Sequence, residues 1–65
     1  MLTRKEAKEA LEQGKKLTHI SFMSSEYIYQ HGIMIFTEEG YSIDQEIFWK
    51  DRNHPGFDKN WSIYK

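Results

Sequence analysis

The chain has 65 residues, no cysteine, and a formal net charge of −1 from nine Lys and Arg against ten Asp and Glu. Its length predicts a single domain over residues 1–65, and without cysteine it forms neither a disulfide nor a thiolate zinc site. Nucleic-acid-binding domains typically carry a net positive charge, which this chain does not have. No apolar run approaches the roughly 20 residues that cross a bilayer, and the polar start lacks a signal-peptide pattern, so we expect a cytoplasmic protein without membrane contact.

Aromatic residues make up 15% of the chain. A domain of this size buries only about 60% of the surface that its unfolded chain exposes, and each buried aromatic side chain removes roughly 150–250 Å² from water. We therefore expect Trp49 and Trp61 to lie in the core. A homo-oligomer is the other common way to stabilise so small a domain, and that alternative stays open.

The first predicted element is a helix that begins after Thr3 and ends at Gly14. Thr3 and Glu6 have the spacing of a capping box, in which each side chain accepts a hydrogen bond from the other residue's backbone. Glycine commonly ends a helix with a positive φ. The apolar residues at helical spacing are Ala7, Ala10 and Leu11. This narrow, mostly alanine stripe predicts that the helix packs closely against a sheet.

Alternating polar and apolar residues predict a strand from Leu17 to Phe22. The polar stretch Ser24-Ser25-Glu26 interrupts it, and either a single helical turn or a continuing strand follows through residues 27–29. The apolar run Ile33–Phe36 predicts another strand. It is joined by a turn, with Gly40 at a position of positive φ, to a partner strand over residues 41–43.

Either Ser42 or Asp44 is expected to cap a second helix from Gln45 to Asp51. The Asn-His-Pro-Gly sequence at 53–56 ends it, and residues 61–64 predict a last strand. The sequence thus predicts an α+β fold, with a small antiparallel sheet of three to four short strands packed against two helices.

No catalytic pattern is present in the sequence. The three histidines are not spaced as metal ligands, there is no Gly-x-Ser-x-Gly elbow, and the four glycines are too scattered for a phosphate-binding loop. We therefore expect a protein that is not an enzyme, with no catalytic residue, no metal site and no cofactor.

Charge is distributed unevenly along the chain. Residues 1–16 carry five Lys and Arg and three Glu, residues 17–47 carry five acids and no Lys or Arg, and residues 48–65 carry four Lys and Arg and two Asp. An anionic partner would avoid the acidic middle and contact the basic ends. The predicted ligand-binding residues are Lys15, Lys16, His19, Arg52 and His54.

The pattern resembles small accessory proteins of bacteriophages and prophages. The likeness rests on a helix entering Gly14-Lys15-Lys16-Leu17-Thr18-His19, then Gly40-Tyr41, Phe48-Trp49 and Trp61-Ser62-Ile63-Tyr64. From about Ala7 to His19 the chain is also similar to phage anti-defence proteins that begin with a helix, GKK and a strand, and sequester nucleotide-derived immune signals as oligomers. This resemblance implies ligand contacts by Lys15, Lys16 and His19, in the cytoplasm of the host cell.

Together these features predict a non-enzymatic phage-type accessory or anti-defence protein that sequesters a nucleotide-derived small molecule or binds a host protein. One alternative is a small nucleic-acid-binding module that uses the basic ends, although nucleic acid is the less expected partner. The other is an interaction or assembly domain, for which residues 33–36 would offer an apolar strand edge.

Overall fold

A computed structural model describes all 65 residues, and its first helix, α1 (Arg4–Glu12), begins at the predicted capping box. The Thr3 hydroxyl accepts a hydrogen bond from the Glu6 backbone N–H at 3.2 Å, and the Glu6 carboxylate accepts one from the Thr3 backbone N–H at 2.9 Å. The bond from the Thr3 backbone lowers the pKa of Glu6 below its ordinary value of 4.5. At the other end, Gly14 has a φ of +84°, as the sequence predicts. The Lys15 N–H donates to the Ala10 carbonyl, which completes a Schellman cap.

Five short strands form one antiparallel sheet in the order β4-β3-β2-β1-β5. Their bounds are β1 (Leu17–His19), β2 (Ile28–His31), β3 (Met34–Thr37), β4 (Ser42–Asp44) and β5 (Trp61–Ile63). The α+β class and the two helices are confirmed, but the sheet has five strands, one more than the upper limit of the predicted three to four. The difference is β2, in the region where the sequence left a helical turn and a strand as alternatives.

The second helix, α2 (Gln45–Asp51), has the predicted bounds. Asp44 is its cap, because its carboxylate accepts from the Glu46 N–H at 2.8 Å, so the Ser42 alternative is wrong. A short 3-10 helix, η1 (Pro55–Phe57), follows in the segment that the sequence predicted only as a helix break. Gly40 has a φ of +93° in the β3–β4 turn, as predicted.

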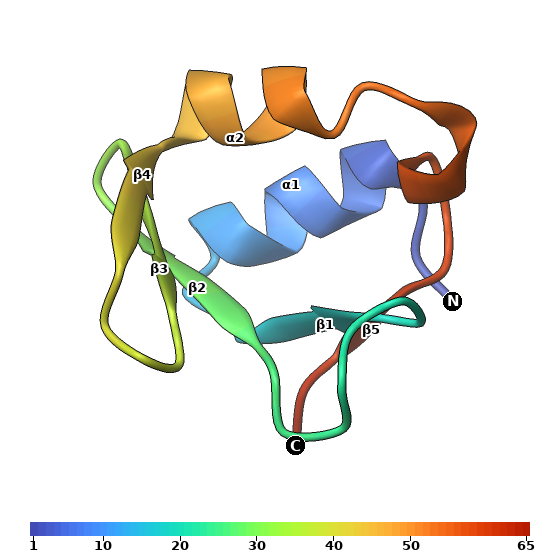
Figure 1. Cartoon of the computed structure of the whole chain (residues 1–65), viewed down its shortest axis with the longest axis horizontal. Helices are drawn as coiled ribbons and strands as arrows, with labels where there is room; N and C mark the ends of the chain where they lie inside the picture. Colours follow the sequence, from blue (N-terminus) through green and yellow to red (C-terminus); the bar gives the residue numbers. More distant parts are fainter.

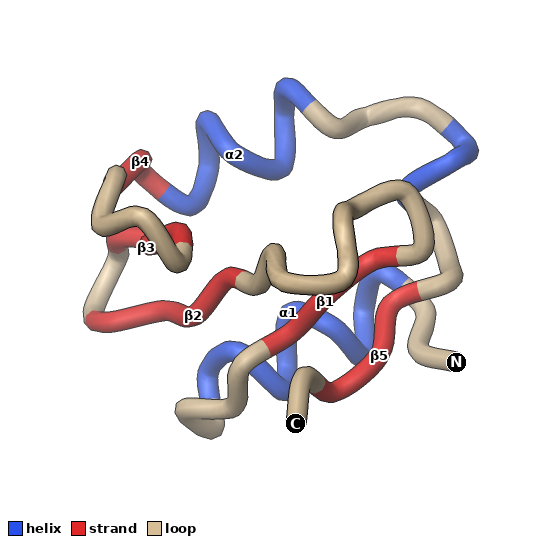
Figure 2. The backbone as a smooth tube through the Cα atoms, turned by 60° about the horizontal axis from the view of Figure 1, so that its bottom comes forward, coloured by secondary structure: helices blue, strands red, loops and turns tan.

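Both helices contribute to a single core on one face of the sheet (Figure 1). Helix α1 packs against β1, β2 and β5, whereas α2 packs against β3 and β4. Figure 2 shows β1 and β5 running side by side, with the two chain ends nearby. The opposite face of the sheet carries no helix. No helix is both long and apolar enough to cross a membrane.

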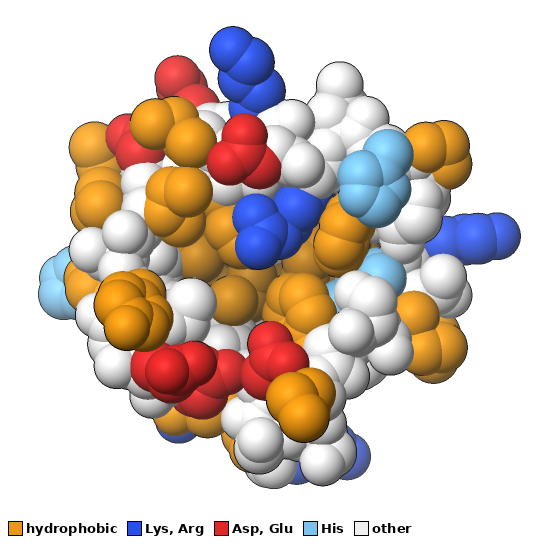
Figure 3. Space-filling model, viewed as in Figure 1, with side chains coloured by type: hydrophobic (Ala, Val, Ile, Leu, Met, Phe, Trp, Pro, Cys, Tyr) orange, Lys and Arg blue, Asp and Glu red, His pale blue; other side chains and the backbone are white.

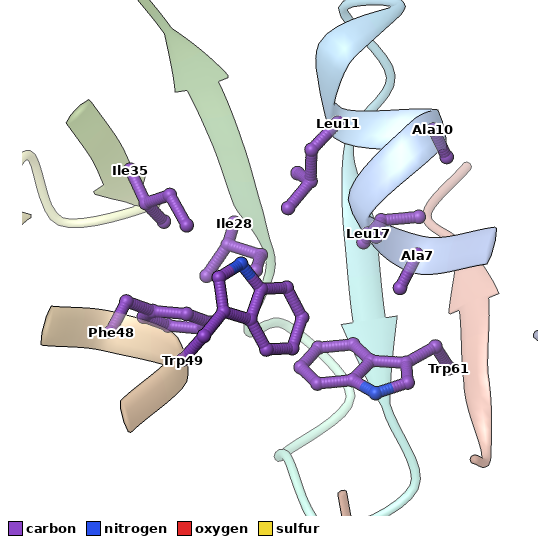
Figure 4. Packing of buried hydrophobic residues seen from close by; sticks show 9 residues of the cluster. All are labelled: Ala7, Ala10, Leu11, Leu17, Ile28, Ile35, Phe48, Trp49 and Trp61. Atoms are coloured by element: carbon purple, nitrogen blue, oxygen red, sulfur yellow. The ribbon is translucent and has the colours of Figure 1, made fainter. Parts of the chain in front are cut away.

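The core combines a small number of aliphatic residues with three large aromatic ones (Figure 4). Trp61 is fully buried and Trp49 is 8% exposed, which confirms that both tryptophans belong to the core. The remaining buried members are Ala7, Ala10, Leu11, Leu17, Ile28, Ile35 and Phe48. The alanines of α1 have small side chains that let this helix lie close to the sheet. The two indole rings, from α2 and β5, pack edge to face with their centres 5.2 Å apart.

The predicted apolar edge at residues 33–36 is wrong, because β3 lies inside the sheet and pairs with β2 and β4. The sheet edges are β4 and β5, each of three residues. Beside β5, Leu2 exchanges two backbone hydrogen bonds with Trp61. Short, partly covered edges offer little backbone to another chain.

Candidate functional site

The predicted ligand-binding residues lie in three different environments. Lys15 and Lys16 are exposed directly after the α1 cap, and the Lys16 Nζ lies 4.8 Å from the centre of the Tyr27 ring. His54 is exposed in the loop after α2, with its ring 4.8 Å from that of Phe57.

His19 is buried and has no ring nitrogen free for a ligand. Its Nδ1 accepts from the Ser21 backbone N–H at 3.1 Å and lies 2.8 Å from the Ser21 hydroxyl. Nε2 therefore carries the proton and donates to the Lys59 carbonyl at 2.9 Å. The rings of Phe57 and Trp61 each lie 4.7 Å away. His19 thus ties β1 to the segment before β5, which is a structural role.

Arg52 follows α2 and is partly buried. Its guanidinium lies 4.0 Å from the centre of the Phe48 ring and donates one long hydrogen bond, of 3.5 Å, to the Phe48 carbonyl. Burial lowers the pKa of Arg52, and the nearby Asp51 carboxylate partly opposes this. The only ion pair in the chain joins Arg4 and Asp58, so the guanidinium of Arg52 keeps several N–H donors without an acidic partner.

The largest hollow is a groove between α1 and α2, called here the interhelix groove, with a volume of about 420 Å³. This size is within the range of small-molecule sites, roughly 300–1,000 Å³. Eight of its nine lining residues have polar or charged side chains, which can bond a polar ligand. The lining residues are Arg4, Lys8, Glu12, Gln30, Gln45, Glu46, Trp49, Lys50 and Asn53. Three cations against two carboxylates leave a net charge of +1 in the groove.

Trp49 is the one hydrophobic residue that lines the groove, and its indole N–H has no acceptor within the protein. No protein group accepts a hydrogen bond from its Nε1, whereas Nε1 of Trp61 donates to the Phe57 carbonyl at 2.9 Å. Every fully buried side-chain nitrogen or oxygen in the chain has a partner, so the Trp49 N–H must still contact solvent. Figure 4 shows this nitrogen on the side of the ring away from Trp61.

Two cations of α1 lie beside the Trp49 ring. The Arg4 Cζ and the Lys8 Nζ are 5.5 Å and 5.4 Å from its centre. Arg4 is already engaged, since its guanidinium binds Asp58 and donates to the Arg52 carbonyl. Lys8 has no ion pair, and the same is true of Lys50 on α2. These two lysines are therefore the cations that the groove can offer to a ligand.

A second, smaller hollow opens on the face shown in Figure 3 and is called here the front hollow. Its volume is about 120 Å³. Figure 3 shows hydrophobic atoms on its floor, Lys or Arg atoms on one side and Asp or Glu atoms on the opposite side. The lining residues are Phe22, Glu26, Tyr27, Ile28, Thr37, Glu38, Glu39, Tyr41, Phe48 and Arg52.

An aromatic row crosses the helix-free face of the sheet. Tyr29 lies opposite Phe36, and their rings are nearly parallel with centres 5.4 Å apart. The centre of the Tyr27 ring lies 6.4 Å from that of Tyr29 and 4.6 Å from that of Tyr64. All four side chains are partly exposed. We call this set the outer aromatic row.

Of the five predicted residues, only Arg52 lines a hollow, and none lines the interhelix groove. A signal for the groove was present in the sequence. Arg4, Lys8 and Glu12 recur every four residues, as do Gln45, Trp49 and Asn53, and such spacing places residues along one face of a helix. What the sequence does not reveal is that these two faces border the same groove.

No group of three His, Cys, Asp or Glu side chains is arranged to hold a metal ion. Comparison of the chain with protein-family models, with curated proteins and with solved structures finds no match.

Proposed function

We propose that this protein is a non-catalytic binding protein of the phage accessory type, which sequesters a nucleotide-derived small molecule in the interhelix groove. The observation that carries the proposal is the Trp49 indole N–H, a donor on a nearly buried ring that no protein group satisfies. An N–H group that has no acceptor inside the protein can donate to a bound ligand in place of water. The resemblance of residues 7–19 to signal-sequestering anti-defence proteins supports the same class of ligand.

The chemistry of the groove suits a planar, anionic ligand. Lys8 on α1 and Lys50 on α2 have no ion pair, and their ammonium groups can bind the phosphate oxygens of a ligand. Gln45 and Asn53 offer amide groups for the hydrogen-bonding edge of a base. The Gln45 side-chain oxygen already accepts from Gln30 at 3.0 Å, which holds the amide in place. A base that accepts a hydrogen bond from Trp49 Nε1 would bring its phosphates near the two lysines.

The two indole N–H groups provide an internal test by NMR. On titration with a panel of linear and cyclic nucleotides, the Trp49 indole resonance should shift, while that of Trp61, bonded to Phe57 inside the core, should stay in place. Isothermal titration gives the affinity in parallel. No heat and no Trp49 shift with any nucleotide would reject the proposal.

Charge reversal locates the site. Lys8→Glu with Lys50→Glu should weaken nucleotide binding about tenfold or more, since each lysine would lose a charge-assisted bond. The matched variant Lys15→Glu with Lys16→Glu tests the cations that the sequence predicted. If this second pair alone abolishes binding, the ligand binds at the Gly-Lys-Lys turn and the groove is the wrong site.

The outer aromatic row favours a second function, binding of single-stranded nucleic acid. Exposed rings on a sheet can stack on bases, at about 1–3 kcal/mol per base, and Lys16 lies beside the Tyr27 ring. Such binding must weaken steeply with salt. A short oligonucleotide that binds at low salt, and loses binding in a Tyr29→Ala variant, would support this function. A flat salt response would reject it.

A further inference from the structure

We propose that the front hollow is a docking site for a peptide segment of another protein, in which an apolar anchor residue stands next to a basic residue. This site is separate from the interhelix groove and does not depend on the function proposed for that groove.

The floor of the front hollow is part of the core. Ile28 and Phe48 are 4% and 2% exposed, and Phe22 packs beside them as a partly buried residue. A volume of about 120 Å³ is well below that of sites for drug-sized ligands, roughly 300–1,000 Å³. The hollow can therefore accept one aliphatic side chain and excludes a nucleotide.

Arg52 supplies hydrogen-bond donors at one side. Its guanidinium is held over Phe48 and makes a single long bond, to the Phe48 carbonyl. The free donors suit the backbone carbonyls of an incoming peptide, because a guanidinium presents several N–H groups in a planar, fixed arrangement. Its aromatic contact holds that arrangement before the peptide arrives.

Carboxylates dominate the charge around the hollow. Glu26, Glu38 and Glu39 line it, against Arg52 as the only cation, which gives a net charge of −2. Glu26 is fixed, since its carboxylate accepts from the Met23 N–H at 3.0 Å, whereas Glu38 and Glu39 have no ion pair. This charge repels phosphates and free carboxylates, and attracts a lysine or arginine.

The occupant follows from these three features together. The hollow has an apolar floor and room for one side chain, which selects an anchor such as leucine. Arg52 donates hydrogen bonds to the peptide backbone beside this anchor. The acids then select a basic neighbour of the anchor. Electrostatic complementarity of this kind contributes more to the specificity for a partner than to the affinity.

Three short peptides test the proposal by NMR titration. N-acetyl-Leu-Lys-amide has the anchor and the basic residue, N-acetyl-Leu-Glu-amide reverses the charge, and N-acetyl-Gly-Lys-amide removes the anchor. The Leu-Lys peptide should shift the backbone N–H resonances of residues 26–28, 37–41 and 48–52, and bind about fivefold more tightly than either of the others. Absence of shifts in these segments, or equal affinity for the three peptides, would overturn the proposal.

A pair of charge-neutralising variants separates the acids of the hollow from the overall charge. Glu38→Gln with Glu39→Gln neutralises two carboxylates that make no ion pair in the fold, and should bring the Leu-Lys and Leu-Glu affinities close together. Glu12→Gln with Glu46→Gln, in the interhelix groove, changes the net charge equally and should preserve the preference. Loss of the preference in both pairs would overturn the proposed site, as would a tighter fit for Leu-Glu in the unaltered protein.

A second copy of the chain is the competing occupant. Light scattering across a range of concentrations should show a monomer whose front hollow remains open to the peptide. A dimer that the Leu-Lys peptide dissociates would mean that the chain itself fills the hollow, and would overturn the proposal of a different partner.

Discussion

Two regions of this small domain differ in whether their side-chain hydrogen-bond donors have acceptors within the protein. In the closed junction, where Leu2, Arg4, His19, Asp58 and Trp61 meet, the side chains of Arg4, His19 and Trp61 each donate to an internal acceptor. On the open side, around Trp49 and Arg52, an indole N–H and several guanidinium N–H groups have none. The two tryptophan rings, with centres 5.2 Å apart, thus differ: the Trp61 N–H is bonded inside the protein, whereas the Trp49 N–H has no acceptor there.

A domain of 65 residues can thus combine a closed core with polar groups that the fold leaves without internal partners. The closed junction gathers the start of the chain, the end of β1 and the segment before β5, so its contacts provide the long-range connections. The N–H groups without internal acceptors on the open side add no hydrogen bond to the fold, so we expect changes to these polar groups to cost little stability. Substitutions in the closed junction should therefore reduce stability more than charge changes on the open side.

The largest effect is expected for Trp61→Ala in the closed junction. Truncation of a fully buried aromatic side chain costs about 3–5 kcal/mol, and the stability of so small a domain is expected near the lower end of about 5–15 kcal/mol. The variant should lose its cooperative thermal transition, as followed by circular dichroism. A transition like that of the wild type would show that Trp61 does not hold this junction together.

Conservative substitution of each tryptophan sharpens the comparison. Trp61→Phe leaves the Phe57 carbonyl without its donor, whereas Trp49→Phe removes no hydrogen bond within the protein. Trp61→Phe should therefore destabilise more, by about 1 kcal/mol or more, as measured by urea denaturation of both variants. Equal losses would contradict the assignment of different roles to the two N–H groups.

The capping box lies beside the closed junction, between Leu2 and Arg4. Thr3→Ala removes the acceptor for the Glu6 backbone N–H and should cost roughly 0.5–2 kcal/mol. Thr3→Ser retains a hydroxyl at the cap and is the matched control in the same denaturation assay. If alanine is tolerated as well as serine, the cap does not stabilise α1.

The same cap makes stability depend on pH. The pKa of Glu6 is lower in the folded protein than its ordinary value of 4.5, chiefly because the Thr3 backbone N–H binds its carboxylate. This contribution is complete above the unfolded pKa and is lost as the pH falls through the folded pKa. The difference in melting temperature between wild type and Glu6→Gln should thus be largest near neutral pH and shrink below 4.5. A difference that does not change with pH would contradict the role of the ionised carboxylate.

The smallest effect on folding is expected on the open side. Lys8→Glu with Lys50→Glu loses one cation contact with the Trp49 ring and no ion pair, so stability should change by about 1 kcal/mol or less. Urea denaturation measures this loss, and nucleotide titration of the same variant measures binding. Loss of the folded state in this variant would contradict the expectation that the open side contributes less to stability than the closed junction.

Local patterns in the sequence predicted most of the elements. The capping box at Thr3, the positive φ of Gly14 and Gly40, and the bounds of α2 all depend on residues within a few positions of one another, and the structure confirms each of them. The burial of both tryptophans was also predictable, because so few other side chains in the chain are large enough to fill a core.

Tertiary structure decided what distant residues do together. Strand β2 forms because β1 and β3 pair with it on both sides, and the buried His19 donates its Nε2–H to the backbone carbonyl of Lys59, forty positions away. The sequence alone determined the helices, the turns and an aromatic core, since those depend on short-range spacing and side-chain size. Which indole N–H stays unpaired, and which cations border it, was decided only when α1 and α2 packed on the same face of the sheet, because hydrogen bonds and charges act over a few ångströms of space and not along the chain.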